Sequence, residues 1–279
     1  MTKQTVLITG ASSGFGYLTV LAFAKKGYRV IATMRDLSNS DDLIEEAKGL
    51  GLHEQISVMQ LDVTNQTDID QVKHKLDQQQ IIIDVLINNA GFCQGGPVEL
   101  VDMDKWRQQF EANVFGVIAV TKAFLPDMRK RRSGKIIMLS SISGRFGFPA
   151  LGPYTSSKFA LEGFSESLRL EMLPFGVYVS LVEPGPYRTK IWEKGMKEAG
   201  IDGEEECSSF VQTLLASAAH SARKSGDPKK VVQRLVAIAN KPKPKLRYPI
   251  GLSTRVLIMG KLFLPWSLIE WMVRYKLKM

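Results

Sequence analysis

The stretch TVLITGASSGFG at residues 5–16 joins a short, mostly apolar run to a turn with three glycines. The run TVLIT has the length and the β-branched content of a buried strand, and a helical pattern, FGYLTVLAFAKKG, follows it. Glycines at the point where strand becomes helix permit a tight turn, and they let a pyrophosphate approach the amide groups and positive end of the helix. The spacing GxxxGxG is neither GxGxxG nor a P-loop. Taken alone, it is compatible with dinucleotide binding or with a simple packing turn.

Similar apolar runs alternate with helical patterns along the chain. Strands that are apolar on both faces and separated by helices predict a parallel sheet covered on each side. With right-handed crossovers this is a doubly wound, Rossmann-type α/β fold with a sheet flanked by helices. The further predicted strands are RVIAT at 29–33, ISVMQLDV at 56–63, DVLIN at 84–88, GKIIMLS at 134–140 and VYVSLVEP at 177–184.

No linker rich in Pro, Gly or Ser divides the chain, which predicts a single domain over residues 1–279. Its first part, 1–190, is the predicted cofactor-binding and catalytic core. The pattern changes after residue 190, and we expect residues 187–246 to form a small helical substrate lid. Within it, Asp227 is a predicted N-cap and Pro228 a predicted first helical residue.

The last segment, 247–279, is predicted to form a strand and a helical extension. KPKPKLRYPIG, at 241–251, contains alternating prolines that cannot sustain a helix, and we expect it to return to the sheet edge in an extended form.

Composition excludes several classes of protein. Neither Cys93 nor Cys207 belongs to a CxxC pair, and the three histidines show no ligand spacing, which argues against a disulfide framework and a metal site and favours a reducing interior. The N-terminal residues lack the pattern of a signal peptide, so we expect a cytoplasmic protein. The net charge of +9 could suggest nucleic acid, but the segment from Lys241 onward has nine Lys or Arg residues and one acidic residue and therefore carries eight of these charges. The nearly neutral body predicts no nucleic-acid partner.

The stretch GPYTSSKFALEG at 152–163 contains a tyrosine and a lysine four residues apart, Tyr154 and Lys158. Residues at this spacing share a helix face. A free tyrosine has a pKa near 10, too high for easy proton exchange at neutral pH. An ammonium about 5 Å away favours the phenolate by roughly 3 kcal/mol at an effective dielectric near 20, so we expect a lowered pKa for Tyr154. The pair by itself also fits a surface ion–dipole pair.

Five elements together make the chain similar to the short-chain dehydrogenase/reductase superfamily over about residues 3–190. They are TGxxxGxG at 9–16, NNAG at 88–91, Ser141, Tyr154-x-x-x-Lys158, and Pro184-Gly185 followed by Thr189. Within the superfamily, ATMRDL, SKFALEG and RYPIG most resemble the branch that contains 17β-hydroxysteroid and retinol dehydrogenases. The resemblance implies an NAD(P)-dependent enzyme that acts on CH–OH groups of a lipophilic substrate, such as a steroid, a retinoid or a long-chain ketone. The rival hypothesis is an NADP(H)-binding sensor or scaffold on the same fold without catalysis.

The resemblance also implies the roles of the candidate catalytic residues. Tyr154 would exchange a proton with the substrate oxygen, Lys158 would tune it and bind the nicotinamide ribose, Ser141 would hold the oxygen, and Asn113 would position a water that relays protons. Ser140 or Ser143 is the alternative to Ser141. The alternative for Asn113 is that its side chain satisfies backbone groups within a helix.

The resemblance carries over a larger set of cofactor contacts. Two positions depart from the family pattern: Phe15 stands where isoleucine is usual, and Tyr187 where a small aliphatic residue is common. Asn89 and Gly91 are expected to have mixed roles, because NNAG also stabilises the central sheet in this family. The predicted cofactor-binding residues are Gly10, Ser12, Ser13, Gly14, Phe15, Gly16, Arg35, Asp62, Val63, Asn89, Ala90, Gly91, Tyr154, Lys158, Pro184, Gly185 and Thr189.

The end of the second predicted strand distinguishes NADP from NAD. An acidic residue there would accept hydrogen bonds from the adenosine ribose of NAD and would repel the extra phosphate of NADP. The strand-end position is Met34, and it is followed by Arg35, whose guanidinium suits a phosphate. Asp36 is expected to point elsewhere, so NADP is the predicted cofactor, although an error of one residue in the strand end would favour NAD.

Apolar residues in the loops around the predicted reaction site favour a lipophilic substrate, unless they are ordinary lid packing. They are Phe92, Phe146, Phe148, Trp192 and Met196.

The C-terminal tail is apolar but is interrupted by Lys261, Pro265 and Glu270, so we do not expect it to cross a bilayer. With Trp266 and Trp271 it could lie weakly on a membrane surface, or it could pack on its own domain or on a partner subunit. The resemblance further implies a homodimer or homotetramer, with subunit contacts through helices near 105–128 and 154–173.

Overall fold

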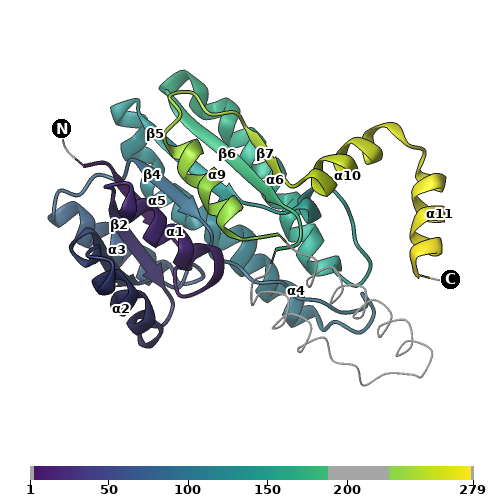
Figure 1. The fold of residues 1–279 in the computed structure, drawn as a ribbon, viewed down its shortest axis with the longest axis horizontal. Coiled ribbons are helices and arrows are strands. Elements are labelled where there is room, and N and C mark those ends of the chain that lie inside the picture. Colours follow the sequence, from purple (N-terminus) through teal and green to yellow (C-terminus); the bar gives the residue numbers. More distant parts are fainter. Residues whose placement is uncertain (1–2, 188–225, 278–279) are drawn as a thin grey trace.

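A parallel sheet of seven strands runs through the computed structural model of the protein, which describes residues 3–187 and 226–277 (Figure 1). The strand order is β3-β2-β1-β4-β5-β6-β7. Val6 of β1 pairs with Val30 of β2 on one side and with Val85 of β4 on the other. The order reverses between β1 and β4, and in open α/β sheets ligands bind at the carboxyl ends of the strands beside such a switch point. The strands are β1 (Thr5–Ile8), β2 (Arg29–Met34), β3 (Ile56–Gln60), β4 (Val85–Asn88), β5 (Gly134–Leu139), β6 (Val177–Pro184) and β7 (Arg247–Ile250).

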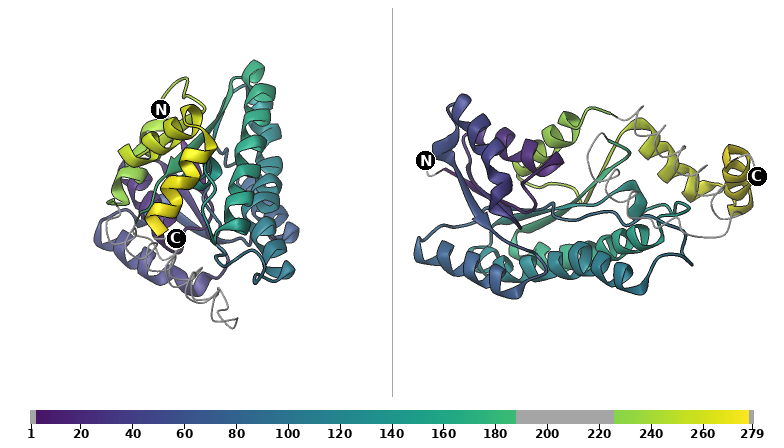
Figure 2. Two further views of the ribbon diagram at one scale, coloured as in Figure 1. Left: turned by 90° about the vertical axis from the view of Figure 1, so that its right-hand side faces the viewer. Right: turned by 90° about the horizontal axis from the view of Figure 1, so that it is seen from below.

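Helices cover both faces of the sheet, as Figure 2 shows. Buried side chains of α1, α2 and α9 belong to one apolar cluster with the sheet, and those of α3, α5 and α6 belong to a second cluster on the opposite face. The doubly wound Rossmann-type prediction is therefore confirmed. The helices of these layers, with α4 preceding α5, are α1 (Gly14–Lys25), α2 (Asp41–Gly49), α3 (Gln66–Gln78), α4 (Met103–Phe110), α5 (Gly116–Arg131), α6 (Gly152–Met172) and α9 (Lys229–Ala239).

Most predicted strands are found within a residue or two of their expected ends, but the third is shorter. β3 ends at Gln60, whereas the sequence suggested residue 63. The predicted start of α9 also shifts: Pro228 occupies the cap position instead of the first helical position. Asp227 nonetheless acts as expected of a cap, because its Oδ1 accepts a hydrogen bond from the Lys229 amide at 2.9 Å.

The C-terminal segment returns to the sheet as predicted, since β7 pairs in parallel with β6 at the edge. Two helices follow, α10 (Leu252–Phe263) and α11 (Trp266–Leu277). They are separated at Leu264, whose extended backbone fits its position before Pro265. In Figure 1 both helices extend beyond the sheet, on the side away from α2. None of the helices within residues 3–187 and 226–277 has the length and apolar character needed to cross a membrane.

Candidate active site

The glycine turn after β1 has no room for side chains at two of its positions. Gly10 has a φ of 68°, and an added Cβ there would lie 2.8 Å from the Ala90 Cα. A Cβ on Gly16 would lie 2.1 Å from the Gly10 carbonyl oxygen. Ser13, at the N-cap of α1, makes no side-chain capping bond. The turn therefore leaves the start of α1 open to an anion, which is the arrangement that a pyrophosphate needs.

Asn89 braces this turn from the neighbouring strand. Its Nδ2 donates to the carbonyl oxygens of Thr9 at 2.8 Å and Gly10 at 2.9 Å. The Thr9 hydroxyl in turn accepts from the amides of Asn89 and Ala90, both at 3.0 Å. These hydrogen bonds account for the structural one of the two roles predicted for Asn89, and its contact with the cofactor stays a prediction.

The end of β2 lies where the sequence predicted it. The strand ends at Met34, and Arg35 follows with an exposed side chain. Asp36 turns into the next residues: its Oδ1 accepts from the Ser38 amide at 2.9 Å, and this hydrogen bond lowers the pKa of Asp36. The carboxylate that would have favoured NAD is thus held in a local turn.

Asp62 and Val63, two of the predicted cofactor contacts, lie after β3. The Asp62 carboxylate accepts hydrogen bonds from the amide and the hydroxyl of Thr64, at 2.9 and 2.7 Å. Val63 is buried, and its carbonyl oxygen would lie 2.7 Å from a Cβ on Gly116, the first residue of α5. Both residues therefore help to hold this corner of the molecule together.

The candidate chemical groups come together at the carboxyl end of β5. Lys158 donates from Nζ to the Leu139 carbonyl oxygen at 2.8 Å, and the same Nζ lies 5.7 Å from the centre of the Tyr154 ring. A hydrogen bond joins the Tyr154 and Ser141 side chains. Tyr154, Lys158 and Ser141 are all buried, so the alternative of a surface pair is excluded.

The electrostatics of the pair differ from the expectation. Burial raises the pKa of Tyr154 well above its ordinary value, Cys93 adds to this rise, and the Ser141 hydrogen bond opposes it. Burial also lowers the pKa of Lys158 to about 8. The predicted lowering of the Tyr154 pKa by Lys158 is wrong for the protein without cofactor. The free energy lost when a phenolate is removed from water is larger than the stabilisation that the neighbouring groups give it.

The three neighbouring serines have distinct environments. Ser141 accepts from the Ser143 amide at 3.1 Å in addition to its bond with Tyr154. Ser140 instead donates to the Glu162 carboxylate at 2.6 Å. The Ser143 hydroxyl is buried and has no hydrogen-bond partner among the described residues. Ser143 therefore stays open as the alternative to Ser141, whereas Ser140 is engaged elsewhere.

Asn113 lies in a π-helical turn, Glu111–Phe115, that joins α4 to α5. Its side chain accepts from the Phe92 amide at 3.1 Å and donates to the Phe92 carbonyl at 3.0 Å and the Ser157 hydroxyl at 3.3 Å. It thus ties the loop after β4 to α6. The backbone groups that it satisfies belong to this loop and not, as its alternative role had assumed, to a helix. Turns of this kind are frequent at functional sites, and the water-relay role stays a prediction.

Cys93 is a site residue that the sequence analysis did not identify. It forms a buried apolar cluster with Leu151 and Tyr154, against which Phe148 packs. Burial raises the pKa of its thiol to about 12, and Lys158 opposes the rise. One feature of the sequence could have pointed to Cys93: it stands two residues after Gly91, in the loop that follows the carboxyl end of a central strand.

The segment after β6 closes the site beside the glycine turn. A Cβ on Gly185 would lie 2.5 Å from the Thr254 hydroxyl, so close packing against α10 favours glycine there. The two departures from the family pattern meet: the rings of Phe15 and Tyr187 pack edge to face with centroids 6.0 Å apart. Thr189 lies outside the described residues.

Part of the predicted apolar surround is present. The rings of Phe146 and Phe148 lie 5.1 Å apart, and Phe148 reaches the cluster around Tyr154. Phe92 is held by Asn113. Trp192 and Met196 lie outside the described residues. Within the described residues, no group of His, Cys, Asp or Glu side chains is arranged to hold a metal. The arrangement of phenol, ammonium and hydroxyl can exchange a proton with a carbonyl or alcohol oxygen in an apolar setting.

Comparison with protein families and relatives agrees with this chemistry. Residues 4–199 match the family model for short chain dehydrogenase. Over 99% of both chains, the protein is 42% identical to the uncharacterized oxidoreductase YusZ of Bacillus subtilis. It is 36% identical to 3-ketodihydrosphingosine reductase of Bacteroides thetaiotaomicron over 98% of both chains.

Two human enzymes confirm the predicted branch. Retinol dehydrogenase 8 is 37% identical over 88% of this chain and 80% of its own, and 17-beta-hydroxysteroid dehydrogenase type 1 is 35% identical over 89% and 77%. Among solved structures, a short-chain dehydrogenase from Streptomyces avermitilis superposes with a TM-score of 0.82 at 30% identity, covering 100% of this chain and 98% of its own. The closed form of a serine dehydrogenase complexed with NADP+ gives a TM-score of 0.75 at 26% identity, covering 88% and 94%.

Proposed function

The chain belongs to the short-chain dehydrogenase family, and from this premise we propose that it is an NADP-dependent oxidoreductase that interconverts a carbonyl and an alcohol on a lipophilic substrate. The observation that carries the proposal is the buried cluster of Tyr154, Lys158 and Ser141 at the carboxyl edge of the sheet. A sensor or scaffold would need the glycine turn but not this cluster, so the cluster favours catalysis over the rival hypothesis.

The residues present fit a dinucleotide. A Cβ on Gly10 or Gly16 would fill the turn beside the open start of α1, as expected where a pyrophosphate approaches the backbone. Residues of the glycine turn would hold the phosphates, Arg35 the extra phosphate of the adenosine ribose, Asp62 and Val63 the adenine, and Lys158 the nicotinamide ribose. When bound, NADP supplies or accepts the hydride.

The side chains of the cluster would divide the proton chemistry among them. In carbonyl reduction Tyr154 donates its hydroxyl proton to the developing alkoxide, and Ser141 holds that oxygen by a hydrogen bond. Lys158, as an ammonium, stabilises the phenolate that remains. Oxidation of an alcohol runs the same proton transfer in reverse.

Support for the substrate class comes from the site and from the relatives. Cys93, Leu151 and Phe148 form an apolar wall around Tyr154. The names of the relatives denote a 3-keto lipid, a retinol and a hydroxysteroid. We therefore place long-chain ketones, retinoids and steroids in the substrate class. Of the predicted lid, residues 187–246, the described part contains α9, which packs on the sheet in the same cluster as α1 and therefore belongs to the core layer. Residues 188–225, the rest of the predicted lid, lie outside the described residues. We keep 1–190 as the proposed cofactor-binding and catalytic part and 247–279 as the C-terminal strand and tail.

A substrate panel with both cofactors tests the function. We expect NADPH oxidation with at least one long-chain ketone, retinal or ketosteroid, and a kcat/KM for NADPH roughly tenfold or more above that for NADH, because Arg35 can pair with the extra phosphate. Arg35→Ala should shrink this preference, whereas Arg29→Ala, exposed at the opposite end of β2, should not. No turnover across the panel contradicts the enzymatic function, and a preference for NADH contradicts the cofactor.

We also propose that this is a cytoplasmic protein that attaches to anionic membrane surfaces through α10 and α11. Beside the start of α10 a groove of about 240 Å³ is lined mainly by Arg and Lys side chains, which complement anionic head groups. Aromatic and aliphatic side chains such as those exposed on these helices insert at the boundary between head groups and acyl chains. The most exposed of them are Leu252, Val256, Met259, Leu262, Phe263, Trp266, Trp271 and Tyr275.

Co-sedimentation with vesicles tests the attachment. We expect the full chain to bind phosphatidylserine-containing vesicles and to lose this binding at high salt. The double variant Trp266→Ala/Trp271→Ala should bind at least about tenfold more weakly, since both side chains would leave the membrane boundary. Leu170→Ala, which removes an exposed apolar side chain from α6, is the matched control. Equal binding by the double variant and the full chain contradicts the proposal.

Finally, we propose a homodimer or homotetramer formed through the helical segments near 105–128 and 154–173, where Phe115 and Phe159 are exposed. Light scattering on the samples used for co-sedimentation should give the mass of a dimer or tetramer for the full chain and for the Trp double variant alike. A mass reduced to that of a monomer in the double variant alone would show that the tail contacts a second copy.

A further inference from the structure

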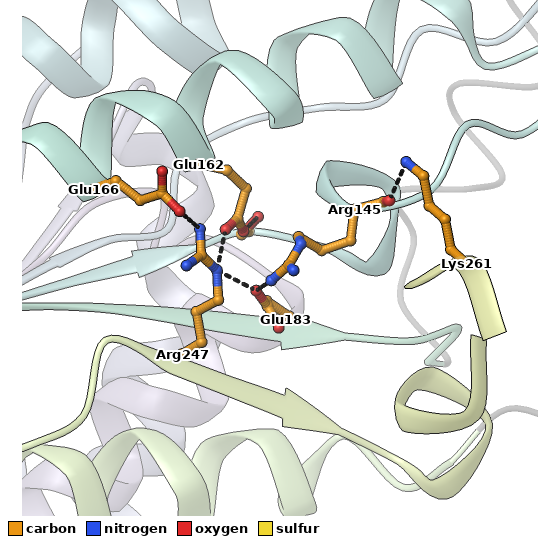
Figure 3. A network of polar contacts seen from close by, with 7 residues as sticks. Arg145, Glu162, Glu166, Glu183, Arg247 and Lys261 are labelled. Atoms are coloured by element: carbon orange, nitrogen blue, oxygen red, sulfur yellow. Dashed lines mark hydrogen bonds and ion pairs between the residues drawn. The ribbon is translucent and has the colours of Figure 1, made fainter. Parts of the chain in front are cut away.

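Two buried carboxylates, Glu162 and Glu183, lie beside Arg247 of β7 (Figure 3). Glu162, on α6, is 5% exposed, and Glu183, in β6, is fully buried. Arg247 bridges them: its Nε lies 3.0 Å from Glu162 Oε2 and 3.2 Å from Glu183 Oε1. Arg145 adds a second cation to Glu183, at 3.1 Å. Carboxylates so deeply buried need such partners, because an unpaired buried charge is strongly destabilising.

Glu162 is linked to the candidate active site in two ways. It lies one helical turn after Lys158 on α6, so the two side chains share a helix face. Its Oε1 accepts a hydrogen bond at 2.6 Å from Ser140, the residue before Ser141. Packing reinforces the link, since a Cβ on Gly144 would lie 3.0 Å both from the Glu162 Cγ and from the Lys158 carbonyl oxygen. The serine segment, residues 140–144, therefore packs directly against α6, the helix that carries Lys158.

Charged groups face Glu162 from each element packed around it. On its own helix these are Lys158 and Glu166, the latter also paired with Arg247. Glu183 of β6 faces it with the same sign, and Arg247 of β7 with the opposite sign. Beyond Glu183 lies Arg145, whose carbonyl oxygen accepts from Lys261 Nζ of α10 at 2.8 Å. Burial, and then Glu183, raise the pKa of Glu162 to about 7, whereas Ser140 and Arg247 oppose the rise.

We propose that Glu162 is a positioning residue for the reaction: held by Ser140 and Arg247, its carboxylate keeps the buried Lys158 ammonium charged and the serine segment seated on α6. The inference rests on the proposed function, in which the Lys158 ammonium stabilises the Tyr154 phenolate. Burial lowers the pKa of Lys158, and two neighbours oppose this, first Cys93 and then Glu162. Of the two, Glu162 is the carboxylate. Without the carboxylate, Lys158 would lose its proton at a lower pH, and a neutral amine stabilises a phenolate poorly.

The pH dependence of kcat/KM for carbonyl reduction tests this role. In Glu162→Gln, which keeps the size of the side chain, the alkaline limb of the profile should move to lower pH by roughly one unit. Glu162→Asp keeps the charge and should keep the limb close to that of the unmodified protein. Glu166→Gln is the matched control, because it removes an exposed carboxylate from the same arginine one turn further on. Its limb should not move.

Titration of Lys158 gives a second readout that does not require turnover. In protein labelled with ε-13C lysine, the Lys158 resonance should titrate at lower pH in Glu162→Gln than in the unmodified protein and Glu166→Gln; Glu162→Met serves if the Gln variant does not fold. Equal titration in these proteins overturns the inference while the proposed function stands. An inactive unmodified protein overturns the proposed function, and the titration still decides the inference.

Discussion

Tyr154→Phe should lower kcat for carbonyl reduction by roughly a thousandfold, the range expected when a positioned general acid is removed. Phenylalanine keeps the ring that packs with Cys93, Leu151 and Phe148, and it lacks only the hydroxyl that donates the proton. The fold and the glycine turn should therefore be unaffected. We expect the Kd for NADPH, from fluorescence titration, to stay close to that of the unmodified protein while turnover is lost.

Tyr28→Phe is the matched control for this prediction. Tyr28 is also buried, and its hydroxyl lies 3.1 Å from the Asn240 Oδ1, at the opposite end of β2 from Arg35. Its loss should cost stability of about 1 kcal/mol and leave kcat unchanged. If Tyr154→Phe retained most of the activity of the unmodified protein, Tyr154 would not be the proton donor, and Ser141 or Ser143 would need to be tested for that role.

Gly16→Ala should weaken NADPH binding strongly and destabilise the fold. The new methyl group would lie 2.1 Å from the Gly10 carbonyl oxygen and 2.6 Å from the Asn89 Nδ2. Because the first of these atoms is backbone, no side-chain rotation relieves the clash, and the turn must move away from α1. We expect a loss of unfolding free energy of about 1–3 kcal/mol, the usual range for overpacking, and a Kd for NADPH weakened by at least about a hundredfold.

Gly163→Ala is the control for this prediction, because it should raise the stability of the protein instead of lowering it. Gly163 lies in α6 with an exposed surface, and a Cβ there would meet nothing within 4 Å. Replacing a helical glycine by alanine should stabilise the protein by roughly 0.5–1 kcal/mol and leave NADPH binding intact. Urea denaturation and fluorescence titration of both variants check the pair. A Gly16→Ala protein that bound NADPH normally would show that the turn is not the phosphate site.

The main features of the fold and the positions of the candidate site were predictable from the sequence. Apolar runs alternating with helical patterns predicted the doubly wound parallel sheet and the end of β2 to within one residue, and the cofactor argument named Met34 itself as the strand end. The four-residue spacing placed Tyr154 and Lys158 on one helix face. Each of these features depends on neighbouring residues, because strand and helix periods determine the face that a side chain occupies.

The environment of those residues was decided only by tertiary packing. Tyr154 packs with Cys93, Leu151 and Phe148, Lys158 is buried as well, and burial reversed the expected direction of the Tyr154 pKa. The contact between Phe15 and Tyr187 could not be read from either position alone.

The same holds for the charge network, in which Arg247 reaches Glu162 from 85 residues away. Burial and ion pairing depend on which distant segments meet, and the free energy of a charge depends on the water that those segments exclude. The sequence by itself therefore determined which groups stand at the carboxyl edge of the sheet, and the packing of β5, β6, β7 and α6 determined how strongly each of them holds its proton.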